Sequence, residues 1–291
     1  MKIFQTTKIP DRHEEFKLSK KVKWYTWSQE MNDFLSIWSI EVRKANRVRR
    51  IYLYNQEYSH DTYTLKTSKI EHTELRKQLY DVADSFYSLK HSSQPIFFTN
   101  MMNEDITFNG LYCFFAALRE ILIRKMNDRW SVICSPVYTR QKNNEGEFPL
   151  HYDMFIPKIL FMIYNNVPRG KQGSSTFLST KELKKILSKT KSYPSKKRKL
   201  FVDMIHKTER RRDQYYDFWD LIHDERNEWY EELHDKMESK KQIVKFQIGE
   251  GFIIHDRFWL HGRTKTRKNP NIKRLIRFIF DTEKTIEKQS I

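Results

Sequence analysis

The chain has 291 residues, a formal net charge of +17, and 14% aromatic and 31% charged residues. This length allows one large domain or two small ones with a substantial core, and the aromatic content excludes a disordered protein. No stretch approaches the length of an apolar membrane span, and the first residues do not have the pattern of a signal peptide.

The charge and the cysteines indicate the environment of the protein. A strongly positive field favours anionic partners such as nucleic acid, phosphates or carboxylates, whereas a Lys-, Asn- and Ile-rich composition also follows from genomic base bias. Cys113 and Cys134 are the only cysteines. Two isolated cysteines are typical of buried free thiols in a reducing compartment. We therefore expect a cytoplasmic globular protein.

The first 130 residues are predicted to mix strands and helices. Residues Arg49 to Tyr58 alternate like a strand, and Thr73 to Lys90 carry apolar residues at helical spacing. Residues Asn109 to Met126 are apolar around most of the circumference of a helix. This second helix is therefore expected to be buried against a sheet.

From Ser131 the pattern changes to strands. We expect strands at 131–139, at Lys158 to Val167 and at 174–178, with turns between them. Ser179 and Glu182 have the spacing of a capping box, which starts a helix.

Residues 189–241 read as a charged helical insertion, a candidate lid over a β core. Its basic runs are followed closely by acidic residues, so a solvated surface with intrahelical ion pairs is favoured over a nucleic-acid surface. The aromatic side chains expected to pack this lid onto the core are Tyr215, Tyr216, Phe218, Trp219 and Trp229. Three strand-like segments follow up to residue 281, separated by "GEG" and "RTKTRKNPN".

His151 and Asp153, in "LHYDMFIP", are candidate metal ligands. On a strand, residues i and i+2 point to the same face, so the imidazole and the carboxylate can converge on one ion. A third ligand must come from a distant strand, and "HDRFWLHGR" offers His255 and His261. Two histidines and one carboxylate form the facial triad of non-haem Fe(II) oxygenases.

The open positions of such an iron must hold a co-substrate and O2. If the co-substrate is 2-oxoglutarate, its remote carboxylate needs a cation, best supplied by Arg and often assisted by a hydroxyl. Arg274 and Arg277 lie on the strand after His261, and Thr176 follows His151 by 25 residues.

These residues give the chain a specific resemblance. The order of "HYD", "GSST", "DRFWLHGR" and "KRLIRFIF" over residues 131–281 resembles the Fe(II)/2-oxoglutarate-dependent dioxygenases of the taurine dioxygenase and clavaminate synthase-like group. The resemblance implies an α+β fold with a double-stranded β-helix (jelly-roll) core, flanking helices and a helical lid. We expect a single domain over 1–291, with a helical and mixed part at 1–130, the core at 131–188 and 242–282, and the lid at 189–241.

The resemblance also implies roles for individual residues. His151, Asp153 and His261 would bind Fe(II), and His261 is preferred to His255 because Gly and Arg follow it. Arg274 would pair with 2-oxoglutarate, with Thr176 assisting. Arg277 is the substitute, since residues three apart lie on opposite faces of a strand. A further residue, Arg263, would contact substrate or co-substrate, or brace its loop.

The expected activity is hydroxylation or desaturation of an unactivated C–H bond in a small substrate, most simply an amino acid or a derivative. A positive lid favours a substrate that carries a carboxylate. Two alternatives remain, namely the same chemistry on a nucleic acid or protein side chain, and a non-catalytic binding module on the same fold. Asp153 argues against a halogenase, in which the carboxylate is replaced so that chloride can bind iron.

Overall fold

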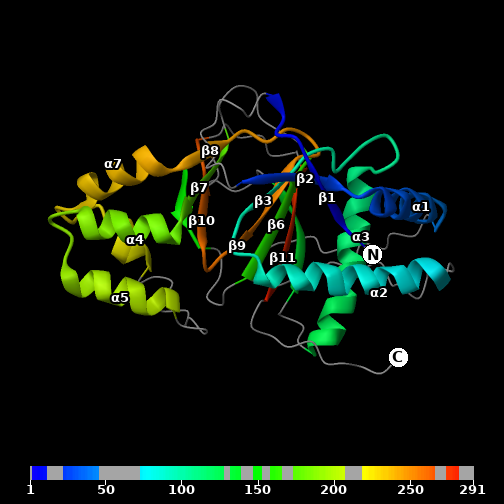
Figure 1. The fold of residues 1–291 in the computed structure, drawn as a ribbon, viewed down its shortest axis with the longest axis horizontal. Coiled ribbons are helices and arrows are strands. Elements are labelled where there is room, and N and C mark those ends of the chain that lie inside the picture. The colour runs from blue at the N-terminus through cyan, green and yellow to red at the C-terminus, as the bar shows by residue number, and fades with distance from the viewer. Residues whose placement is uncertain are drawn as a thin grey trace.

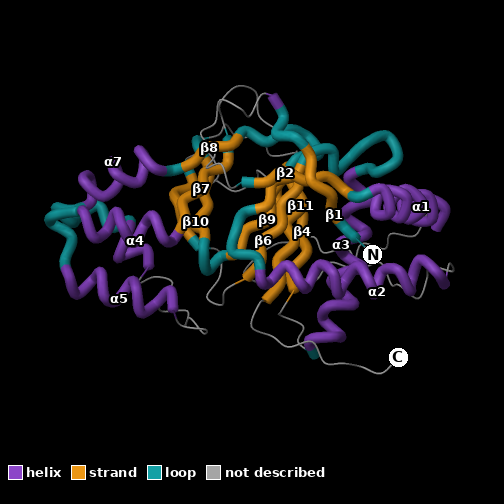
Figure 2. Tube along the Cα trace, viewed as in Figure 1, coloured by secondary structure: helices purple, strands orange, loops and turns teal. Residues whose placement is uncertain are grey.

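Two β-sheets form the centre of the protein, and helices lie outside each of them (Figures 1 and 2). The structure is a computed structural model. It describes residues 2–11, 22–45, 73–127, 132–138, 147–152, 158–165, 173–206, 218–265 and 273–281. Both helices and strands are present, as the sequence predicts. The predicted strand at Arg49 to Tyr58 lies outside the described residues.

The larger sheet has seven strands in the order β1-β2-β3-β9-β6-β11-β4. In that order the strands are β1 (Phe4–Thr7), β2 (Lys23–Trp27), β3 (Ile96–Phe98), β9 (Gly251–His255), β6 (Lys158–Tyr164), β11 (Lys273–Asp281) and β4 (Val132–Tyr138). Only the β2–β3 pair is parallel. The sequence patterns predict β4, β6 and β11, and they predict strands in the N-terminal part without locating β1, β2 and β3, which are three to five residues long.

The smaller sheet has four antiparallel strands in the order β5-β10-β7-β8. They are β5 (Phe148–His151), β10 (Trp259–Arg263), β7 (Ser175–Ser179) and β8 (Gln242–Val244). The segment from Gly251 to Arg263, which the sequence presents as one strand-like stretch, divides into two. A turn at Asp256 to Phe258 separates β9 from β10, so that the chain passes from the larger sheet to the smaller one.

Three helices cover the outer face of the larger sheet: α1 (Gln29–Ala45), α2 (Thr73–Ser88), which continues into a 3-10 turn (Leu89–His91), and α3 (Phe108–Met126). Both helices predicted in this region are confirmed, and α3 is buried along nearly its whole length. The rings of Phe86, Phe115, Phe161 and Phe278 join the helices to the sheet at centroid separations of 4.9 to 5.9 Å.

Alternation along β6 separates two cores. Ile159, Phe161 and Ile163 point toward helices α1 to α3, whereas Leu160 and Met162 belong to the core between the two sheets. From the smaller sheet, β7 and β10 contribute Phe177 and Trp259 to this inter-sheet core. Because side chains alternate along a strand, these assignments tell which residues of each strand face the space between the sheets.

A second helical layer covers the outer face of the smaller sheet (Figure 1). It consists of α4 (Thr180–Lys189), α5 (Ser195–His206), a short helix at 218–222 and α7 (Tyr230–Lys240). The predicted start of α4 is confirmed, since Ser179 Oγ accepts a hydrogen bond from the Glu182 amide at 3.1 Å. Phe218 and Trp229 are buried in this layer, as expected of aromatic residues that pack a lid. Tyr215 and Tyr216 lie outside the described residues.

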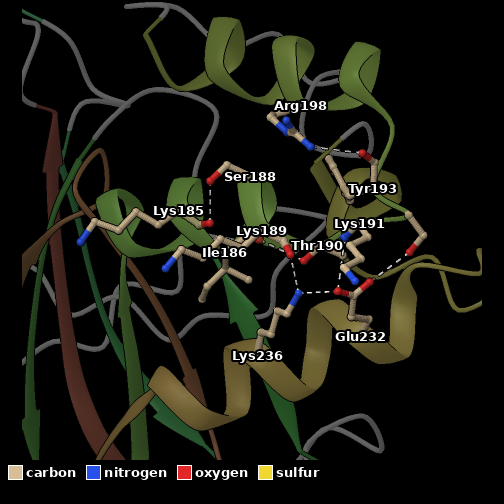
Figure 3. Close-up of polar contacts among 11 residues, drawn as sticks. Lys185, Ile186, Ser188, Lys189, Thr190, Lys191, Tyr193, Arg198, Glu232 and Lys236 are labelled. Carbon is tan, nitrogen blue, oxygen red and sulfur yellow. Dashed lines mark hydrogen bonds and ion pairs between the residues drawn. The ribbon is translucent and has the colours of Figure 1, made fainter.

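Glu232 of α7 holds the layer together at the end of α4 (Figure 3). Its carboxylate accepts hydrogen bonds from the Lys191 amide and the Ser192 hydroxyl, both at 3.3 Å, and pairs with Lys236. Lys236 also donates to the Lys189 carbonyl at 2.6 Å. The end of α4 and the middle of α7 are therefore tied by several polar contacts in addition to their apolar core.

The two cysteines are buried free thiols, as predicted. Burial raises the pKa of the Cys134 thiol well above its ordinary value, and the nearby Arg119 opposes this only in part. Among the described residues, none of the helices combines the length and apolar character needed to cross a bilayer.

Candidate metal centre

His151 and His261 form a cross-strand pair in the smaller sheet. The two residues are register partners of β5 and β10, and their ring centroids are 4.4 Å apart. Both are buried, with 1% and 6% of their surface exposed. Residues 110 positions apart in the sequence are thus brought into direct contact by strand pairing.

A bulge in β5 shapes this pairing. His261 opposes His151 and Arg263 opposes Phe148, so β5 uses one more residue than β10 between the two pairs. The additional length includes Pro149, which has no amide hydrogen to donate to a ladder. The carbonyl oxygen of Pro149 accepts a hydrogen bond from Nδ1 of His151 at 2.9 Å.

This hydrogen bond fits His151 for metal binding. A carbonyl oxygen only accepts, so Nδ1 of His151 carries the proton and Nε2 presents its lone pair. Backbone carbonyls commonly orient metal-bound histidines in this way. Two buried imidazoles on adjacent strands, one of them held in the metal-binding tautomer, therefore fit two ligands of one ion.

The structure does not add the other predicted ligands to this pair. Asp153 lies outside the described residues. His255 ends β9, where its Nδ1 accepts from the Arg257 amide at 3.1 Å, and it alternates with Ile254 of the inter-sheet core. Within the described parts of the chain, no three His, Cys, Asp or Glu side chains are grouped to hold a metal. The third ligand is thus still a prediction for Asp153.

Thr176 shares its face of β7 with Leu178, which belongs to the core under the second helical layer. An added Cβ at Gly262, the partner of Thr176 on β10, would meet Oγ1 of Thr176 at 2.8 Å. His261 pairs with Phe177, one residue further along, whose side chain points between the sheets. The hydroxyl on the face of Phe177 is that of Ser175, which is hydrogen-bonded to the Tyr164 hydroxyl at 2.5 Å.

The face of the strand also distinguishes the candidate arginines of the site. Leu275 and Ile279 of β11 belong to the inter-sheet core, and Arg277, which is partly buried, lies between them on the same face of the strand. Ile276 faces helices α1 to α3. The side chain of Arg274 lies outside the described residues. Arg263 is partly buried at the end of β10.

Two residues beside His151 were not predicted as site residues. Trp219, expected only to pack the lid, lies with its ring nearly parallel to that of His151, at 6.4 Å and an angle of 15°. His223 donates from Nε2 to the Leu150 carbonyl at 2.8 Å, and its ring is 4.6 Å from that of Trp219. No sequence pattern links 219–223 to β5, because these contacts depend on how the second helical layer packs against the smaller sheet.

The pKa of His223 is lowered to about 4, mainly because burial disfavours the charged imidazolium. The hydrogen bond to Leu150 opposes this shift, while the neighbouring His234 and His151 add to it. His223 is therefore a neutral donor at physiological pH.

A cleft of about 660 Å³ opens at the end of the smaller sheet, beside the first turn of α4. Its lining includes the cationic side chains of Lys181, Lys184, Lys240 and Arg257, with Glu182 as the lone carboxylate. Neither His151 nor His261 lines it.

No family model matches the chain, and no curated protein matches its sequence. One similar solved structure is an asparagine oxygenase in complex with Fe(II), 2S,3S-3-hydroxyasparagine and succinate, with 11% identity, a TM-score of 0.41 and coverage of 88% of this chain and 93% of that chain. A second is the non-haem iron oxygenase OrfP in complex with Fe, succinate and (3S)-hydroxy-L-Arg, with 10% identity, a TM-score of 0.41 and coverage of 89% and 94%. A third is PvcB from Pseudomonas aeruginosa, with 12% identity, a TM-score of 0.36 and coverage of 71% and 84%.

Proposed function

We propose that the protein is an Fe(II)- and 2-oxoglutarate-dependent oxygenase that hydroxylates an unactivated C–H bond of a small substrate, an amino acid or a derivative. The observation that carries this proposal is the buried pair of His151 and His261, in register on adjacent strands. The His-x-Asp and His-Gly-Arg motifs around these two residues add the chemistry of a facial triad.

In this proposal His151, Asp153 and His261 are the iron ligands. When bound, Fe(II) and 2-oxoglutarate would supply the electrons that activate O2, with 2-oxoglutarate oxidised to succinate and CO2 and the second oxygen atom left to oxidise the substrate C–H bond. The chain holds the two imidazoles in place by the β5–β10 pairing and fixes the tautomer of His151 through Pro149. Desaturation of the substrate would use the same residues.

For the remote carboxylate of 2-oxoglutarate we propose Arg277, because it lies on the same face of β11 as Leu275 and Ile279 of the inter-sheet core. Arg can bind a carboxylate through two parallel hydrogen bonds. The assisting hydroxyl in this proposal is that of Ser175, which shares the face of Phe177. Arg274, Thr176 and Arg263 are the alternatives to be tested beside them.

We further propose that the two facing sheets form a double-stranded β-helix and that the whole chain is one domain. The second helical layer, within which we expected the lid at 189–241, would keep water away from the reacting atoms. The two buried thiols fit the reducing interior of a cell, so we propose a cytoplasmic location.

The charge of the chain bears on the substrate. The net positive charge of the chain favours a small substrate that carries a carboxylate. The alternative substrate is a nucleic acid, which the net charge of +17 also favours. Substrate binding that weakens steeply with salt would support the nucleic acid, and binding indifferent to salt would support the small molecule.

Succinate release tests the enzyme proposal. The wild type with Fe(II), 2-oxoglutarate and O2 should release succinate, and Asp153→Ala should not. Absence of turnover in the wild type across a broad substrate screen would favour a non-catalytic binding module. The screen should use mass spectrometry and begin with amino acids, asparagine and arginine included, looking for the gain of one oxygen or the loss of two hydrogens.

A further inference from the structure

The strand that carries His151 is short and lies at an edge. β5 has four residues, and among the described strands it pairs with β10 alone, because it is the first strand of the smaller sheet. Alternate backbone groups of such a strand point away from its partner and need other groups to bind them. The position of His151 therefore depends on what covers the outer edge of β5.

His223 covers that edge. Its Nε2–H donates to the Leu150 carbonyl at 2.8 Å, one residue before His151. The ring of Trp219 fills the space between His223 and His151. Leu150 itself is buried in the core shared with the second helical layer. The layer thus contacts β5 through a directed hydrogen bond as well as through apolar packing.

His223 is itself firmly held. The Tyr193 hydroxyl donates to the Leu221 carbonyl at 2.9 Å, and His234 of α7 bonds the Ile222 carbonyl at 3.1 Å. These contacts connect the short helix at 218–222 to the turn after α4 and to α7, which Glu232 ties to each other (Figure 3). A movement of the layer would therefore be transmitted to His223.

We propose that His223 is a positioning residue for the metal centre, which fixes β5 and with it His151 by binding the Leu150 carbonyl. This inference rests on the proposed function for the identity of the ligand, although the restraint on β5 does not depend on it. The second helical layer would then support the metal centre as well as shield it.

Three variants separate this role from general stability. His223→Ala removes the donor, and His223→Gln keeps an amide N–H at the reach of Nε2. His234→Ala is the comparison variant, because His234 also bonds a backbone carbonyl, Ile222, but can affect β5 only indirectly, through the support it gives to His223. The affinity for Co(II) is measured by titrating the metal-free protein and following the absorption of the bound Co(II). Backbone hydrogen exchange is followed separately in residues 148–152.

Removing an outer partner of a metal ligand typically costs about 10–100-fold in affinity. We expect that loss of Co(II) affinity in His223→Ala, near-complete recovery in His223→Gln and a smaller loss in His234→Ala, which leaves the bond from His223 to Leu150 in place. Equal affinity in His223→Ala and wild type, or an equal loss in the Ala and Gln variants, would overturn the proposal.

Hydrogen exchange in residues 148–152 tests the positioning role of His223 independently of the proposed oxygenase function. If the wild type binds no Co(II), the proposed function fails, but exchange in β5 still reports on the restraint. Faster exchange of residues 148–152 in His223→Ala than in His234→Ala supports the role of His223. Equal exchange in the two variants excludes it.

Discussion

Lowering the pH should destabilise the metal-free protein through His223. Its pKa falls from 6.5 to about 4 on folding, because the buried ring is disfavoured as a cation. The unfolded chain binds a proton at this residue below its ordinary pKa, and the folded chain does not. The contribution of His223 is therefore fully present above pH 6.5 and is lost as the pH falls toward 4.

The two pKa values give the size of the effect. At pH 5 the unfolded state is favoured by about 2 kcal/mol relative to neutral pH through this one residue. The assay is urea unfolding at pH 7 and pH 5 for the wild type and for His223→Gln, which cannot titrate. Carboxylates affect both proteins alike, so the wild type should lose about 2 kcal/mol more than the variant. An equal loss in the two proteins would refute the assignment of a buried neutral imidazole.

Three further substitutions test other parts of the structure. Gly262→Ala places a Cβ 2.6 Å from the Phe148 carbonyl oxygen, so β5 must shift. We expect the free energy of unfolding to fall by about 1–3 kcal/mol and Co(II) binding to weaken. Unchanged values of both would contradict the register of β5 and β10. Arg277→Ala should raise the KM for 2-oxoglutarate by about 30-fold or more through loss of a charge pair, whereas Arg274→Ala should change it little. The opposite result would make Arg274 the co-substrate ligand. Leu260→Ala, at a fully buried position between the smaller sheet and the second helical layer, should cost about 2–5 kcal/mol by thermal or urea unfolding, and a near-neutral effect would show that the layer is loosely packed.

Helices were the part of the fold most accessible from the sequence. Residues 73–90 and 109–126 repeat their apolar residues at helical spacing over four turns or more, and both form helices in the structure. The strands β1 to β3 are too short for a clear alternation. β9 and β10 were read as one stretch, because "FIIHDRFWLHGR" has no Gly or Pro at the turn where the chain changes sheets.

For the candidate site, the sequence proposed residues on particular strands but could not decide which way each side chain points. "GSST" offers adjacent hydroxyls, and a shift of one residue moves a side chain to the other face of a strand. Ser175 rather than Thr176 consequently shares the face of Phe177. The same reasoning separates Arg277 from its neighbour Ile276. The contact of His151 with His261 follows from strand register, which depends on the whole sheet.

The hydrogen bond from His223 to Leu150 also has a consequence for behaviour at high concentration. An uncovered edge strand offers its backbone to a strand of another molecule, which is a common route to aggregation. β5 is such an edge, and Phe148 on it is 39% exposed. By occupying the Leu150 carbonyl, His223 blocks the growth of the smaller sheet into a second molecule. Loss of the second helical layer would therefore leave β5 open to strand pairing with a second molecule.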